Sequence, residues 1–203
     1  DFKDTDAEFA MLRGMVEISG RPMSITIEQD DRWPDVWARV LHNIAEANKA
    51  GLPIKGQVPP RATGLLLGLT ASLNPFVMHQ TFRSIWGAPL DQQLKALRDP
   101  EFRAALLAEE PVYPAGEIIE MLCVGYHKMF ALGEVPNYEP APEMSVKAIA
   151  AATGKNPREV ILDMMLERDG KALLYFPLMN YTSGSFDNVE KMLRHPNTAF
   201  GLS

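Results

Sequence analysis

The segment ANKAGLPIKGQV, residues 47–58, holds the transition from a predicted helix to a predicted strand. Apolar residues recur at helical spacing over residues 36–45, which places them on one face of that helix. Gly51 ends the helix, and Pro53 opens a short run, residues 53–58, that reads as a strand. A helix followed closely by a short strand is the repeating element of an alternating α/β chain.

The same arrangement occurs about 31 residues earlier in the chain. Apolar residues recur at helical spacing over residues 5–19, Gly20 ends that helix, and residues 22–29 predict a strand because they are short and rich in β-branched side chains. An offset of about 31 residues matches the length of one βα unit. The two segments therefore predict consecutive units of one sheet.

Two further units are predicted near the end of the sequence. Residues 156–159, Asn-Pro-Arg-Glu, predict a capped helix start, with Asn accepting a backbone N–H bond and Pro at the first helical position. That helix is expected to run to about Arg168 and to be followed by a strand over residues 171–179. The last unit is a helix over residues 186–193 and a strand over residues 198–203.

The residues between these pairs of units have a different character. Residues 59–144 are punctuated by Gly and Pro and predict a helical insertion, in which Asp99 and Pro100 begin a helix that ends near Ala108. We therefore expect βα units in residues 1–58 and 145–203, interrupted by this insertion, within a single incomplete domain.

Alternation of helix and strand predicts an α/β fold with a parallel sheet covered by helices. The sequence begins on a helix and ends on a strand, whereas a complete parallel fold normally begins with a strand. We therefore expect a partial (β/α)8 TIM-type barrel, with about half of the strands and a helical insertion. The alternative is a complete, small, open α/β domain.

Composition excludes several classes of protein. The net charge of -6 argues against nucleic-acid binding, which rewards Lys and Arg. The single cysteine, Cys123, excludes a disulfide framework and favours a reducing compartment, so we expect a cytoplasmic protein in which Cys123 is a packed core residue. The sequence contains no apolar run of about 18 residues, so we predict no membrane span.

In a barrel, the reacting groups come from the carboxyl ends of the strands and from the loops that follow them. That rule selects Glu28 as a metal ligand or substrate contact, with ordinary strand-end polarity as the alternative. It also selects Gln57, Asn180 and Arg61, of which Arg61 either clamps a carboxylate or is an ordinary surface residue. None of the four histidines forms a ligand-spaced pair, and His79 is the one that we expect near a substrate.

Five segments of the chain, in order, carry a resemblance to a known family. They are SGRPMSITIEQ (19–29), GLPIKGQVPPRATGLLLGL (51–69), ALRDPEFRAALLAE (96–109), MSVKAIAAATGKNPREVILDMMLERDGKALLYFPLMNY (144–181) and VEKMLRHPNTAFGLS (189–203). Together they resemble the middle of the N-acyl-D-amino-acid deacylase (D-aminoacylase-like) group of amidohydrolases.

The resemblance implies a metal-dependent barrel hydrolase that uses one or two Zn²⁺ ions to cleave the amide bond of a small-molecule N-acyl amino acid. It also implies an Asp just beyond Ser203 that binds metal and acts as general base. No catalytic residue is therefore assigned within residues 1–203, and this stretch alone is expected to be inactive and to bind no metal. Homo-oligomer formation stays open.

The chain departs from the better-known members of that group at two strand ends. Where those members carry histidine, the matching places read Ile27-Glu28-Gln29 and Gln57-Val58. Either a single metal is held by histidines upstream and by the Asp expected downstream, or Glu28 is a metal ligand, as an oxygen donor in place of histidine. The candidate substrate contacts are Gln57, Arg61, Asn180 and His79. The alternative function is a complete, non-catalytic α/β module whose Gly- and Pro-rich middle binds a partner.

Overall fold

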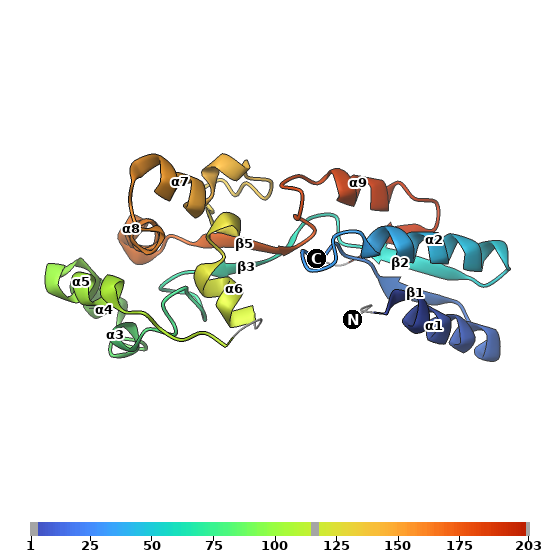
Figure 1. Ribbon diagram of the computed structural model, residues 1–203, viewed down its shortest axis with the longest axis horizontal. Coiled ribbons are helices and arrows are strands. Elements are labelled where there is room, and N and C mark those ends of the chain that lie inside the picture. Colours follow the sequence, from blue (N-terminus) through green and yellow to red (C-terminus); the bar gives the residue numbers. More distant parts are fainter. Residues whose placement is uncertain (1–3, 115–117, 202–203) are drawn as a thin grey trace. The chain divides into compact units, whose positions relative to one another are not determined.

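The computed structural model describes residues 4–114 and 118–201 of the chain (Figure 1). The fold is α/β, which confirms the coarse prediction from the sequence. The chain divides into two compact units. The first joins Asp1–Thr63 to Pro177–Ser203, and the second comprises Gly64–Phe176.

The first unit contains a three-stranded sheet whose paired strands are parallel. Its strands, in spatial order, are β1 (Met23–Thr26), β2 (Ile54–Val58) and β6 (Thr198–Phe200). Met23 lies opposite Ile54, and Gly56 lies opposite Thr198. The predicted strands of the first, second and last units therefore do form one parallel sheet.

Three helices accompany this sheet: α1 (Thr5–Ser19), α2 (Val36–Lys49) and α9 (Asp187–Leu193). The α1 helix begins where the Asp4 side chain accepts a hydrogen bond from the Ala7 backbone N–H at 3.2 Å. It ends at Gly20, whose φ of 62° lies in the left-handed region that glycine adopts at little cost. The helix-ending role of Gly20 that the sequence predicts is thus confirmed.

One face of the parallel sheet is buried and the other is open to solvent. Along β2, Ile54, Gly56 and Val58 are buried, whereas Lys55 and Gln57 are exposed, as the two-residue period of a strand requires. The buried face packs on apolar side chains from the three helices, which include Phe9, Val16, Val40, Leu41, Ile44, Val189 and Met192. The core of this unit therefore lies between the sheet and its helices.

The second sheet contains β3 (Thr63–Leu67), β5 (Leu174–Met179) and β4 (Phe130–Ala131), in that spatial order, with β4 antiparallel to β5. The helices of the second unit are α3 (Gln80–Arg83), α4 (Leu90–Arg98), α5 (Pro100–Ala108), α6 (Ile118–Val124), α7 (Val146–Thr153) and α8 (Pro157–Gly170), with short 3₁₀ turns η1 (Tyr126–Lys128) and η2 (Pro142–Met144). This unit extends beyond the predicted insertion, residues 59–144, to include α7 and α8.

The structure does not show a partial barrel, because each described sheet has only three strands. The predicted strand 171–179 does form, as β5, but it lies outside the parallel sheet, and β2 pairs directly with β6. Of the four predicted strands, the first, second and last therefore share one sheet, and the third lies in another. The β3 strand pairs with β5. The sequence did not predict β3, because the glycines and prolines in and around it are typical of a loop.

The α8 helix confirms the capped start that its sequence predicts. The Asn156 side chain accepts a hydrogen bond from the Arg158 backbone N–H at 2.9 Å, and Pro157 is the first helical residue. Near its other end, Arg168 and Asp169 both have a φ of 52°, so regular helical geometry stops close to the predicted end. Among the described residues, no helix combines the length and the apolar character needed to cross a membrane.

Candidate functional site

The segment after β1 is tied to the residue that follows β5. The Gln29 backbone N–H donates to Asn180 Oδ1 at 2.7 Å, and the Asn180 backbone N–H donates to the Gln29 carbonyl oxygen at 2.9 Å. Asn180 is fully buried and has a φ of 64°, in the left-handed region that Asn tolerates better than most residues. Two strand ends that are far apart in the sequence therefore meet at one place.

Two more of the predicted site residues lie at this place. Asn180 Nδ2 donates to the Arg61 carbonyl oxygen at 3.5 Å. The Glu28 carboxylate accepts a hydrogen bond from the Thr63 hydroxyl, and both side chains are partly buried. We call Glu28, Arg61, Thr63 and Asn180 the strand-end cluster. It brings together three residues that the strand-end rule selects and adds Thr63, the first residue of β3, which no sequence pattern singled out.

The side chains of the strand-end cluster have different roles. Both ends of the Asn180 amide are used by main-chain groups, those of Gln29 and Arg61, so Asn180 positions the chain around it. Glu28 contributes a carboxylate whose hydrogen-bond donor is a hydroxyl rather than a cation. The lone pairs of this carboxylate that Thr63 does not use can accept further hydrogen bonds.

Gln57 lies on the solvent-exposed face of β2 and not within the strand-end cluster. Its side-chain Nε2 donates to Ser24 Oγ of the neighbouring strand at 2.9 Å. The two residues therefore form a cross-strand polar pair, as neighbouring positions on one face of a sheet commonly do.

His79 belongs to the second unit, where its side chain is buried. Its ring packs edge-on against Phe76, with 5.1 Å between ring centroids. Neither ring nitrogen has a well-formed hydrogen bond to any residue that the structure describes. Burial lowers the pKa of His79, and the positive charge of Arg158 lowers it further. The imidazole is therefore neutral at pH 7.

The described residues do not fit a zinc site. Across residues 4–114 and 118–201, no group of three or more His, Cys, Asp or Glu side chains could hold a metal ion. Cys123 is buried, as predicted, and burial raises the pKa of its thiol to about 11, which disfavours the thiolate that zinc requires. Ser203 and the Asp expected after it lie outside the described residues.

A second polar group, which the sequence-based predictions do not include, is centred on Arg158. The Arg158 guanidinium donates from Nη1 to the Glu109 carbonyl oxygen at 2.7 Å. It also meets the Glu110 carboxylate with both terminal nitrogens, at 3.1 and 2.8 Å. In the sequence, Arg158 stands out only as part of a helix start. The signal that could have indicated this group is the pair of adjacent acids, Glu109 and Glu110, directly after α5.

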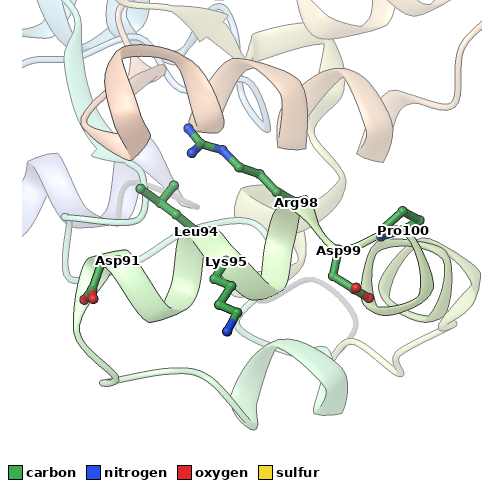
Figure 2. A pocket seen from close by; sticks show the side chains of 6 residues that line it. All are labelled: Asp91, Leu94, Lys95, Arg98, Asp99 and Pro100. Carbon is green, nitrogen blue, oxygen red and sulfur yellow. The ribbon is translucent and has the colours of Figure 1, made fainter.

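A surface pocket of about 600 Å³ lies along α4 and the start of α5 (Figure 2). Its lining residues are Asp91, Leu94, Lys95, Arg98, Asp99 and Pro100. Arg98 points away from Lys95 and pairs with Asp169 of α8 at 3.3 Å. Asp99 caps α5 by accepting hydrogen bonds from the Glu101 and Phe102 backbone N–H groups. These two charged groups therefore have structural partners, and the pocket suggests no chemistry.

No protein-family model matches the chain, and neither a curated protein nor a solved structure matches it.

Proposed function

We propose that this chain is part of a metal-dependent amidohydrolase that cleaves the amide bond of N-acyl amino acids within a (β/α)8 barrel. The proposal rests on the resemblance of its ordered segments to the D-aminoacylase-like group. The single observation that supports it is the strand-end cluster, in which a partly buried carboxylate, Glu28, lies just beyond the carboxyl end of a parallel strand. Reacting groups of barrel enzymes occupy that position.

In this proposal, Glu28 accepts a proton or a hydrogen bond from the substrate or from the attacking water, while Thr63 orients its carboxylate. Arg61 would hold the substrate carboxylate through parallel hydrogen bonds, and Asn180 would keep the surrounding main chain in place. Zn²⁺ is the cofactor that this class of hydrolase uses to activate water. Since the described residues do not fit a zinc site, we derive no step through the metal.

The proposal also includes a cytoplasmic location, inferred from the single buried cysteine, and a small-molecule substrate without nucleic-acid or membrane partners. Homo-oligomer formation stays open.

The test uses the protein encoded by the whole reading frame, loaded with Zn²⁺ and assayed on N-acetyl-D- and N-acetyl-L-amino acids. We expect release of free amino acid, and we expect Glu28→Gln to lower kcat by about 100-fold or more. Glu46→Gln is the matched control, because Glu46 is an exposed carboxylate on α2 that pairs with Lys49. No hydrolysis of either series, or equal activity of Glu28→Gln and Glu46→Gln, would reject the proposal.

The second candidate function is a non-catalytic α/β binding module. The observation that favours it is the second compact unit, Gly64–Phe176, which contains both the nearly buried Arg158 guanidinium and the buried His79 side chain. The same assay separates the candidates, because a module of this kind hydrolyses neither series of substrates even when the strand-end cluster is intact.

A further inference from the structure

The Arg158 guanidinium is nearly buried, yet it holds the carboxylate of an exposed side chain. The Arg158 side chain is 11% exposed, whereas that of Glu110 is 81% exposed. The Nη1–Oε1 and Nη2–Oε2 distances of 3.1 and 2.8 Å describe two parallel hydrogen bonds. This is the geometry with which arginine recognises any planar carboxylate.

Arg158 is held in place by groups other than the Glu110 carboxylate. Its backbone N–H is capped by Asn156 at the start of α8, and its Nη1 donates to the Glu109 carbonyl oxygen at 2.7 Å. Glu109 is itself fixed, because its carboxylate accepts hydrogen bonds from the Gln80 and Thr81 backbone N–H groups. The guanidinium would therefore keep its orientation if the Glu110 carboxylate moved away.

Two side chains that the charge of Arg158 influences, those of His79 and Tyr113, have buried polar atoms with unmet hydrogen-bonding capacity. Neither ring nitrogen of His79 nor the Tyr113 hydroxyl makes a well-formed hydrogen bond to a described residue. The charge of Arg158 acts on both groups: it helps burial to lower the pKa of His79, and it opposes the burial that raises the pKa of Tyr113 to about 12. Buried polar groups without partners are costly, so an additional polar molecule here would be favourable.

We infer that the Arg158 guanidinium is a binding site for a small organic carboxylate, and that the Glu110 side chain occupies this site as a displaceable internal ligand. A buried guanidinium needs an anion, because an uncompensated buried charge is strongly unfavourable. The chain supplies that anion from an exposed residue for which the described residues record no ion pair other than Arg158. A solvent-borne carboxylate can replace it without moving the guanidinium.

A monocarboxylate fits this site better than a more highly charged anion does. The guanidinium offers two parallel donors, which match the two oxygens of one carboxylate. Glu109, whose main-chain carbonyl contacts Arg158, also carries a carboxylate, which binds the start of α3; this second negative charge disfavours a dianion such as phosphate. This inference does not rest on the hydrolase proposal, because it concerns binding and involves no residue of the strand-end cluster.

The test is a titration of the 203-residue chain with sodium acetate, at constant ionic strength maintained with sodium chloride. Glu110→Ala removes the internal ligand, so we expect its acetate dissociation constant to be about tenfold lower than that of the wild type. Calorimetry and the NMR signal of the Arg158 side-chain Nε–Hε group report the binding. Acetate should also raise the Tm of Glu110→Ala more than that of the wild type.

Two further variants separate this site from general anion binding. Adding Arg158→Lys to Glu110→Ala keeps the charge and removes the paired donors, so acetate binding should be lost. Asp169→Asn is the matched control: it also releases an arginine, Arg98, but that side chain is 54% exposed, and no gain is expected. Should Glu110→Ala fail to fold, Glu110→Gln, which keeps the shape and removes the charge, takes its place. An unchanged affinity in the Glu110 variant, or an equal gain in Asp169→Asn, overturns the inference.

Discussion

Gln29 and Asn180, which lie 151 positions apart in the sequence, exchange two hydrogen bonds, one through a side chain and one through main-chain groups alone. The Asn180 side chain thereby stands in for a main-chain carbonyl, and the segment after β5 continues alongside the segment after β1. Since both residues are buried, this contact has no competition from solvent and should contribute strongly to the stability of the first unit.

Replacement of Asn180 by alanine should therefore be costly. Asn180→Ala leaves the buried Gln29 N–H without its acceptor. It also puts alanine at a φ of 64°, a backbone conformation that alanine tolerates less well than asparagine does. We expect a loss of about 2–4 kcal/mol in the free energy of unfolding, measured with urea. Asn180→Gly removes the same hydrogen bond but relieves the backbone strain, so its free energy of unfolding should fall less than that of Asn180→Ala. Equal stability of Asn180→Ala and wild type would contradict the role of this contact.

Gly56 should not tolerate a side chain, because its neighbours on the buried face of the sheet already fill the space. A Cβ atom there would overlap the Ile27 side chain and approach Thr198 Cγ2 to 3.2 Å. Gly56→Ala should lower the free energy of unfolding by about 1–3 kcal/mol. Gly14→Ala, in α1, is the control: a Cβ there meets nothing within 4 Å and should raise helix stability by about 1 kcal/mol. Thermal unfolding of both variants checks the contrast.

The neutral state of His79 makes stability depend on pH. Burial and the charge of Arg158 lower the pKa of His79 in the folded state below its ordinary value of 6.5, so at mildly acidic pH the unfolded chain binds the proton and the folded chain does not. The free energy of unfolding should therefore fall as the pH drops below about 6.5, by at most about 1.4 kcal/mol per pH unit for this group. Above pH 6.5, His79 should not lower the free energy of unfolding.

Urea unfolding at pH 7.5, 6.5 and 5.5 measures that slope. His79→Leu should reduce it, whatever its effect on stability at neutral pH. His195 acts in the same direction, since burial and the charge of Lys55 lower its pKa, so part of the slope should persist in His79→Leu. A slope identical to that of the wild type would show that His79 takes up its proton in the folded state as easily as in the unfolded one.

Asp99 should stabilise α5 as its N-cap (Figure 2). Its side chain accepts hydrogen bonds from the backbone N–H groups of Glu101 and Phe102, at 3.1 and 2.9 Å. Asp99→Ala should lower the free energy of unfolding by about 1 kcal/mol, whereas Asp99→Asn, which keeps an acceptor oxygen, should lose much less. Equal losses in the two variants would attribute the effect to charge rather than to the hydrogen bonds.

Local signals made most helices predictable, whereas strand pairing depends on contacts that no local pattern encodes. The caps at Asn156 and Asp99, and the glycine at position 20, act within a few residues, and the structure confirms each of them. The β3 strand was missed because its glycines and the prolines before it resemble a loop. Without β3, nothing in the sequence could place β5 in a sheet separate from β2 and β6.

The same distinction applies to the candidate site. Glu28, Arg61 and Asn180 were found because they follow strands, and strand ends can be read from the sequence. Thr63 was missed because it begins a strand rather than ending one, and the ion pair of Arg158 with Glu110 was missed because its partners lie 48 positions apart. The burial of His79 was equally out of reach, since a histidine in a loop gives no local indication of what covers it.

The attachment of Glu109 to the start of α3 has a consequence for the order of folding. This helix is only 4 residues long, and its cap comes from a side chain 29 positions away, so it has no means of forming before that part of the chain has closed. We therefore expect α3 to form only after Glu109 has come close to Gln80. The ring of Trp86, just after α3, lies 6.5 Å from that of Phe82, so fluorescence would follow this step in a variant that lacks the other two tryptophans, Trp33 and Trp37.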